Sequence, residues 1–294
     1  MIFTELNGGL GNQLFQYAAG RALAHRHRTE LFLGIASLNA VTRRVTKRHF
    51  ELDRFSHIGR IARANMSLPS IFKRLPMLSR LISPWQMHTE IGPNFDPHFI
   101  DLPNQTYLVG YWQSYRYFAE ISKTLFSELT PTQPLSEQST LVASRLSESN
   151  VTSVGLHVRR GDYVSSASAS KYHGLLPLSY YEAALKLVHK YLNNPSIYVF
   201  SDDVPWCREN LPIKDSEAIF VSHNVGSDAW QDLILMSHCR HNVIANSSFS
   251  WWGAWMADQR WLGSNRLVIA PSRWFVAHDK HNLTDRFPIN WEVL

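Results

Sequence analysis

The sequence has little cysteine and no long apolar run. Its two cysteines, Cys207 and Cys239, are too few for a disulfide framework and match no zinc-binding spacing, which predicts buried thiols in a reducing compartment. No stretch reaches the roughly 18 consecutive apolar residues that a membrane-spanning helix needs. The N-terminal MIFTELNGGLGNQ also lacks the basic flank and apolar core of a signal peptide, so the sequence predicts a cytoplasmic protein.

Familiar nucleotide- and metal-binding signatures are missing as well. The loop NGGLGNQ is not followed by G-K-S or G-K-T, which excludes a nucleoside-triphosphate P-loop. Counted from Gly9 and Gly11, the third glycine of G-x-G-x-x-G is replaced by Leu14. No D-x-D occurs, and the contiguous carboxylates of SDD (201–203) diverge in an extended chain. We therefore expect no metal ion at a diphosphate, whose charge positive side chains have to balance.

Charged residues are scarce, at 18% of the 294 residues against 45% hydrophobic ones, which indicates a globular protein of one large or two smaller domains. The net charge of +5 suggests an anionic partner: nucleic acid, a membrane surface or a phosphorylated small molecule. No nucleic-acid-reading motif accompanies the basic residues, which gather in 41–81. That segment is interpreted as solvated surface, with peripheral contact to acidic lipids at the inner membrane face as the alternative.

Hydrophobic patterning predicts an α/β fold. MIFTEL, a helix over 14–27 and ELFLGI (30–35) form a strand–helix–strand unit. The proline-containing PTQPLSEQ (131–138) marks a boundary between an N-terminal domain, 1–140, and a C-terminal domain, 141–294.

The second half reads as a doubly wound sheet. Beyond about residue 150, short apolar strands alternate with helices, which predicts parallel strands covered on both faces. One helix, LSYYEAALKLVHKYL, is expected to begin with Ser179 as N-cap.

Three polar stretches, HVRRGDY, SDD and NSSFS, follow predicted strands of this sheet, at the edge where α/β proteins bind ligands. Alternation along GLHVRRGDYV places His157 and Arg159 on one face and Arg160 on the other. In our interpretation Arg159 contacts an anionic ligand, while Asp162 or another carboxylate holds Arg160. The alternative is that both arginines form structural ion pairs.

A second anion site is predicted where a helix follows IANSS. Asn246, Ser247 and Ser248 lie at the helix start, whose N–H groups and dipole favour phosphate, although ordinary N-capping also explains them. The tryptophans that follow are expected to be packing residues: Trp251, Trp252 and Trp255.

Taken together, GGLGNQLFQYA, HVRRGDYV and SSFSWWGAW resemble the bacterial α-1,2-fucosyltransferases, glycosyltransferase family eleven, over nearly the whole chain. The resemblance implies a GT-B fold of two Rossmann-like domains, with an acceptor-side N-terminal domain and the donor nucleotide on the C-terminal one. It implies inverting, metal-independent and cofactor-free transfer of L-fucose from GDP-fucose to the 2-hydroxyl of a terminal galactoside. The acceptor would be a galactose-terminated oligosaccharide or a lipid-linked glycan, in surface polysaccharide or O-antigen synthesis.

The resemblance also assigns residues. Arg159 corresponds to an arginine that binds the donor β-phosphate, with His157 beside it, and Asn12 to an asparagine that contacts the donor or the transition state. Asp232 falls where related α-1,6 enzymes place an aspartate that reads guanine. The catalytic set is thus Arg159 and Asn12, and the donor-binding set is Gly9, Gly11, His157, Arg159, Asp232, Ser247 and Ser248. Arg160 and Asp162 form the structural pair, and no general base is assigned.

Two further readings stay open. One is a glycosyltransferase that makes another fucosyl linkage or uses another nucleotide-sugar. The other is a non-catalytic carbohydrate-binding protein, which would explain the ten tryptophans but not the arginine pair at a strand end.

Overall fold

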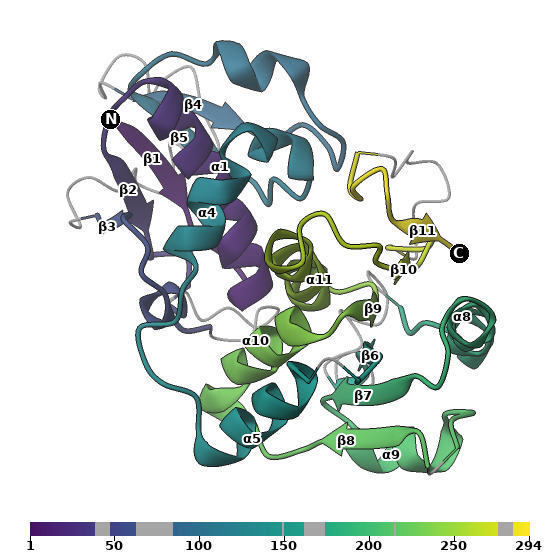
Figure 1. Cartoon of the computed structure of the whole chain (residues 1–294). Helices are drawn as coiled ribbons and strands as arrows, with labels where there is room; N and C mark the ends of the chain where they lie inside the picture. The colour runs from purple at the N-terminus through teal and green to yellow at the C-terminus, as the bar shows by residue number, and fades with distance from the viewer. Residues whose placement is uncertain (39–47, 63–84, 149, 162–173, 215, 276–284) are drawn as a thin grey trace. The chain divides into compact units, whose positions relative to one another are not determined.

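The chain folds into two compact α/β units (Figure 1). The computed structural model describes residues 1–38, 48–62, 85–148, 150–161, 174–214, 216–275 and 285–294. The N-terminal unit is Met1–Thr132 with His281–Phe287, and the C-terminal unit is Gln133–Lys280 with Pro288–Leu294.

These units divide the chain earlier than the predicted 140/141 boundary. Helix α5 (Glu137–Leu146) belongs to the C-terminal unit, because the Gln231 side chain accepts a hydrogen bond from the Ser136 N–H, 2.8 Å away, and Leu146 packs in that unit's core. In addition, residues 285–287 return to the N-terminal unit, a crossing that the sequence analysis did not predict.

The N-terminal unit is built on a five-stranded sheet of order β3-β2-β1-β5-β4, in which every pair is parallel. Its strands are β1 (Ile2–Glu5), β2 (Leu31–Gly34), β3 (Arg60–Ile61), β4 (Gln86–Thr89) and β5 (Thr106–Val109). Its helices are α1 (Leu10–Arg26), α4 (Ser122–Glu128) and the short η1 (Leu52–Arg54), η3 (Pro97–Asp101), η4 (Tyr115–Tyr117) and η5 (Ala119–Ile121). The predicted strands around 1–6 and 30–35 are confirmed. The edge strands β3 and β4 were missed, because neither shows the apolar alternation of a buried strand.

The two faces of this sheet are covered differently. Helix α1 packs on the Thr4 face, where Gly20 approaches so closely that an added Cβ would lie 3.1 Å from the Thr4 Cβ. On the opposite face Phe3 stacks on Tyr107 with ring centroids 4.1 Å apart, and Trp85 packs at their edge. All four residues of β1 are buried, as expected for a strand that is covered on both faces.

The C-terminal unit contains a six-stranded parallel sheet of order β11-β10-β9-β6-β7-β8. Its strands are β6 (Ser153–Val158), β7 (Ser196–Ser201), β8 (Ala218–Val221), β9 (His241–Val243), β10 (Val268–Ala270) and β11 (Glu292–Val293). Its other helices are α8 (Leu178–Tyr191), α9 (Val204–Asn210), η6 (Gly226–Asp228), α10 (Trp230–His238) and α11 (Ser248–Arg260).

Side chains of β7 show that this sheet is doubly wound, as predicted. Ile197 and Val199 pack in one core with α8 and α9, whereas Tyr198 and Phe200 pack in the other with α5 and α10 (Figure 1). Both cysteines are buried free thiols, which confirms that part of the prediction made for them.

The start of α8 corrects one detail. The helix begins at Leu178 with Pro177 as its N-cap residue, and no side chain caps it, so the predicted N-cap at Ser179 is wrong. Proline suits the start of a helix because its φ is already near the helical value and its missing N–H costs no helical hydrogen bond there.

Membrane contact through 41–81 stays a prediction, since only 48–62 of that segment lies within the described residues. Within 48–62, Leu52 and Phe55 are buried, and the Glu51 N–H donates to the Gln13 side chain of α1. Among the helices that the structure describes, none is long and apolar enough to cross a bilayer.

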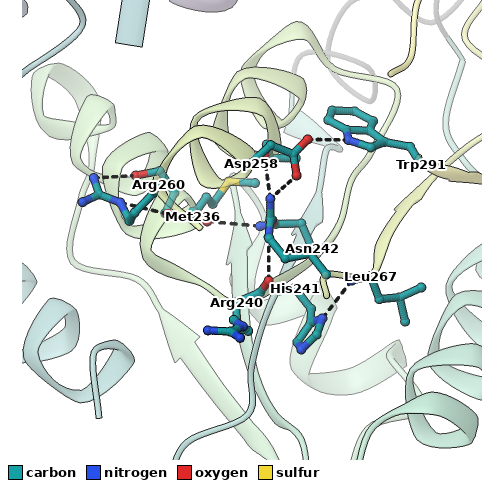
Figure 2. A network of polar contacts seen from close by, with 11 residues as sticks. Met236, Arg240, His241, Asn242, Asp258, Arg260, Leu267 and Trp291 are labelled. Atoms are coloured by element: carbon teal, nitrogen blue, oxygen red, sulfur yellow. Dashed lines mark hydrogen bonds and ion pairs between the residues drawn. The ribbon is translucent and has the colours of Figure 1, made fainter. Parts of the chain in front are cut away.

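A buried polar network ties α11 and the C-terminal strand region to the sheet (Figure 2). Arg266 donates to Asp258, to the Asn242 side chain at 2.6 Å and to the Arg240 carbonyl at 2.7 Å. Trp291 donates to the other oxygen of Asp258 at 2.7 Å. The Arg266 side chain is 4% exposed, so its charge depends on Asp258 for compensation.

Replacing Asp258 by asparagine should therefore destabilise the protein. Removing one partner of a buried ion pair leaves an uncompensated charge, and we expect the free energy of unfolding to fall by about 3–5 kcal/mol. Denaturant unfolding, followed by tryptophan fluorescence, measures the change. Asp228→Asn is the matched control, because Asp228 is exposed and should change stability by less than about 0.5 kcal/mol.

Candidate active site

The polar stretches that follow β9, β6 and β7 meet at one edge of the C-terminal sheet. These strands are adjacent, and the register pairs Val158 with Ser201 on one side and Leu156 with Val243 on the other. Their carboxyl ends therefore bring residues 157–161 of HVRRGDY together with SDD and NSSFS, as the sequence predicted.

Arg159 follows β6 directly and forms an ion pair with Asp202. The Arg159 Nη1 lies 2.6 Å from the Asp202 Oδ2, and the Asp202 Oδ1 accepts the Arg160 N–H at 2.8 Å. A Cβ added at Gly161 would lie 2.9 Å from the same Oδ2, so the glycine is what lets Asp202 reach the strand end. About a quarter of both side chains is exposed, which leaves the pair accessible to a ligand.

Arg160 is held by different groups. Its Nε lies 3.2 Å from the Asp203 Oδ2, and its guanidinium stacks 3.9 Å from the centre of the Trp206 ring. Asp203 also caps α9 by accepting the Trp206 N–H. The carboxylate at Arg160 is thus Asp203, while the predicted partner Asp162 lies outside the described residues.

The positive charges of the adjacent Arg159 and Arg160 repel each other, and two carboxylates offset this repulsion. Asp202 and Asp203 diverge, as predicted for SDD, and each carboxylate takes one guanidinium. Sequence reasoning missed these pairings because they depend on β7 lying beside β6. The sequence did contain a signal for them, since HVRR and SDD each stand at the end of an apolar strand.

His157 is buried beside this pair. Burial, with a smaller contribution from the Arg159 charge, lowers the pKa of His157 to about 4, and the nearby Asp202 opposes the shift. Its ring centroid lies 5.9 Å from that of Phe249, in the first turn of α11. His157 is therefore neutral near pH 7, and it fixes the end of β6 against α11.

Helix α11 begins at Ser248, with Ser247 as N-cap residue. The Ser247 side chain makes no hydrogen bond to the helix, which disfavours ordinary capping as its role. Asn246 is buried and its amide nitrogen donates to the Gly174 carbonyl at 3.1 Å. The tryptophans of α11 are core residues, as predicted: Trp251, Trp252 and Trp255 are all at most 3% exposed.

Asp232 lies in the first turn of α10, and its Oδ1 accepts from the Asn224 amide at 2.7 Å. The Asn224 Oδ1 in turn accepts from Ser139 at 3.0 Å. Burial raises the pKa of Asp232 to about 7, and the Asn224 hydrogen bond only partly opposes the shift. Asp232 is thus a carboxylate held in place by an amide and poised near neutral pH.

In the N-terminal unit, the glycine-rich loop leads from β1 into α1. Gly9 is the N-cap residue and Gly11 is buried in the first turn, but the left-handed φ of +81° occurs at Gly8. Asn12 lies directly above Gly8, where an added Cβ would be 2.5 Å from its Nδ2. Gly8 is therefore the residue whose missing side chain makes room for Asn12.

The whole chain, residues 1–294, matches the family described as glycosyl transferase family 11. The chain belongs to glycosyl transferase family 11. One family relative, an alpha-1,2-colitosyltransferase of Escherichia coli, is 31% identical over 99% of this chain and 98% of its own length. A galactoside alpha-(1,2)-fucosyltransferase 1 of Lagothrix lagotricha is 26% identical over 85% of this chain and 64% of its own length.

The fold of this family 11 protein is also found in a solved fucosyltransferase. The structure of NodZ from Bradyrhizobium superposes with a TM-score of 0.50 over 86% of this chain and 92% of that one, at 13% identity. The expected GT-B fold is confirmed, and membership of family 11 makes the protein a glycosyltransferase.

Proposed function

We propose that the protein transfers L-fucose from GDP-fucose to the 2-hydroxyl of a terminal galactoside, with inversion at the anomeric carbon and without a metal ion or cofactor. The observation that carries this proposal is the accessible Arg159–Asp202 pair, which shares the strand edge with the start of α11 in a family 11 chain. Two similar proteins support it: the NodZ alpha-1,6-fucosyltransferase has a crystal structure soaked with GDP-fucose, and one relative is a galactoside alpha-(1,2)-fucosyltransferase.

The chemistry requires stabilisation of a departing diphosphate. As the bond to the anomeric carbon breaks, negative charge grows on the β-phosphate while the sugar becomes oxocarbenium-like. In the proposed mechanism Arg159 and the N–H groups at Ser247 and Ser248 bind this growing charge, and they bind it more strongly than the ground state. A guanidinium carries five N–H donors, so one edge can hold Asp202 while another binds phosphate.

The proposal gives two further residues a role, one in each unit. Asp232 accepts from N1–H and the exocyclic amino group of guanine, a donor pair that adenine does not present. Asn12 donates to the donor sugar-nucleotide in the transition state. The base for the acceptor hydroxyl is left unassigned, and a departing phosphate oxygen can serve instead.

A second donor is favoured by one relative. Colitose lacks the 3-hydroxyl of fucose, and the relative that is 31% identical is an alpha-1,2-colitosyltransferase. The same Arg159, Asp232 and α11 groups would bind GDP-colitose, because they contact the nucleotide rather than the sugar. Only a group near the 3-hydroxyl separates the two donors, and a site built to bond that hydroxyl rejects the deoxy sugar strongly.

The test is release of the donor's nucleoside diphosphate with lactose as acceptor and EDTA present: GDP from GDP-fucose and from GDP-colitose, and UDP from UDP-galactose. We expect acceptor-dependent release from GDP-fucose that EDTA does not reduce, and an α-1,2-linked product by NMR. A higher kcat/KM for GDP-colitose would transfer the proposal to that donor. Binding of GDP-fucose without turnover across galactoside acceptors would favour the carbohydrate-binding reading, and release only from UDP-galactose would refute the donor assignment.

A further inference from the structure

A buried chain of hydrogen bonds connects the segment 285–287 to the first turn of α1. The Arg286 Nη1 donates to the Gln113 Oε1 at 2.5 Å, and the Gln113 Nε2 donates to the Asn12 Oδ1 at 2.8 Å. Arg286 is 2% exposed and Gln113 is 8% exposed, so water does not compete for these bonds. All three residues belong to the N-terminal unit.

The Arg286 guanidinium sets the donor-to-acceptor direction of this series of hydrogen bonds. Arginine has only N–H donors, so the group that Gln113 turns toward Arg286 has to be its oxygen. The Gln113 amide nitrogen then faces Asn12, so the Asn12 oxygen has to be the acceptor. These two bonds together fix the orientation of both amides, with the Asn12 oxygen facing Gln113 and the Asn12 nitrogen turned away from it.

The surroundings hold the three residues in place. The loop before Gln113 is fixed by Glu90, whose two oxygens accept the Tyr111 and Trp112 N–H groups at 2.7 and 2.9 Å. Trp112 adopts a left-handed φ of +56°, a costly conformation for a bulky residue that this anchoring maintains. The Glu90 carboxylate also interacts electrostatically with Arg286, which compensates the buried cation.

Arg286 itself is anchored through its neighbour. The Asp285 Oδ1 pairs with the Arg116 Nη1 at 2.8 Å, and the Asp285 carbonyl accepts from the Ser114 hydroxyl. The loop that carries Gln113 is therefore held on both sides of this residue: before it by Glu90 and after it by the bond from Ser114 to Asp285. A guanidinium placed this firmly can dictate which atom of Gln113 faces it.

We infer that Gln113 and Arg286 are positioning residues that fix the Asn12 amide with its nitrogen as hydrogen-bond donor to the sugar-nucleotide. This inference rests on the proposed function, in which Asn12 meets an anionic donor. A reversed amide would point its oxygen at phosphate and repel it, so correct polarity matters more than correct position. Neither residue contacts the reacting atoms.

Gln113→Glu tests polarity apart from packing. The new carboxylate accepts from Arg286 as the amide does, and the added ion pair keeps the fold stable. It cannot donate to the Asn12 Oδ1, so Asn12 has to turn its nitrogen inward. We expect kcat for transfer to fall by about tenfold to hundredfold, with the KM for GDP-fucose changed less than about threefold and the melting temperature unchanged or raised.

Gln16→Glu is the matched control. Gln16 is also buried on α1, accepts from the Asn7 N–H at 2.9 Å and donates to the Gly110 carbonyl at 3.0 Å. No arginine is among these partners, so this variant should lower the melting temperature and leave kcat within about twofold. At the other end, Arg286→Lys, which still only donates, should retain more kcat than Arg286→Gln, which can accept as well.

The inference is overturned if wild type transfers fucose and folded Gln113→Glu keeps its kcat within twofold. If wild type transfers no sugar, the proposed function fails instead, and the side-chain amide of Asn12 provides the remaining readout. Its ¹⁵N signals, assigned by their loss in Asn12→Asp, should shift in Gln113→Glu and stay in place in Gln16→Glu. Unchanged signals in both variants would refute the positioning role independently of catalysis.

Discussion

Arg159→Ala should abolish most of the transfer activity, lowering kcat by about 10²–10³-fold, which corresponds to roughly 3–4 kcal/mol of transition-state stabilisation. The reason is that the β-phosphate gains charge as the sugar leaves, and Arg159 is a partly exposed cation at the carboxyl end of β6. The KM for GDP-fucose should rise less than kcat falls, because the interaction strengthens in the transition state. Steady-state GDP release in EDTA measures both constants.

Arg160→Ala is the matched control for this result. It removes the same charge from the neighbouring position, but Arg160 is occupied by Asp203 and by the Trp206 ring. We expect a loss of stability with a kcat at least tenfold above that of Arg159→Ala. If the two variants lost equal activity at equal stability, the separate roles given to the arginines would be wrong.

The affinity for GDP should increase as the pH rises through 7. Guanine binding requires Asp232 as a carboxylate, and burial raises the pKa of Asp232 to about 7. At lower pH the protonated Asp232 therefore has to release its proton before guanine can bind. Below that pKa the Kd should rise with decreasing pH toward a limit of about tenfold per pH unit, and above about pH 8 it should be constant. In Asp232→Asn this dependence should vanish, and binding should weaken by about tenfold or more because a charged hydrogen bond is lost.

The measurement is calorimetric titration with GDP between about pH 5.5 and 8.5. Because the phosphates of GDP also titrate, the decisive quantity is the difference between wild type and Asp232→Asn at each pH, with Asp228→Asn as the variant of equal charge. An unchanged pH profile in Asp232→Asn would exclude Asp232 from guanine binding.

The same pKa shift affects folding with a defined sign. The folded-state pKa lies above the ordinary value of 3.8, so the contribution of Asp232 to stability is largest below about pH 4 and is lost as the pH rises to about 7. A bound guanine would supply the missing donors, so GDP should stabilise the protein more at pH 8 than at pH 6.

The strands of the second half could be predicted from the sequence because they are short apolar runs bounded by polar residues. The position of their carboxyl ends could therefore be predicted too, and so could the grouping of Arg159 with the serines at the start of α11. The partners of the arginines could not be predicted, since Asp202 and Asp203 reach them only because β7 lies beside β6. Periodicity within a segment says nothing about strand order across a sheet.

The N-terminal half was less predictable for two physical reasons. Its edge strands are short and polar, so they give no periodic signal. The hydrogen-bond partner Gln113 lies 101 residues after Asn12, and Arg286, which donates to Gln113, lies a further 173 residues along the chain. The loop glycines were recognised, but only the backbone shows that Gly8, rather than Gly9 or Gly11, has the left-handed conformation.

The return of residues 285–287 to the first unit bears on how family members can be recombined. A chimera that joins the first 132 residues of one enzyme to the remainder of another would take Gln113 from one parent and Arg286 from the other. Unless both parents use the same pair, the amide chain at Asn12 would lose its cation or face a mismatched one. Exchange of N-terminal units therefore calls for three crossover points, at 132/133, 280/281 and 287/288, so that the short return segment is exchanged with its own unit.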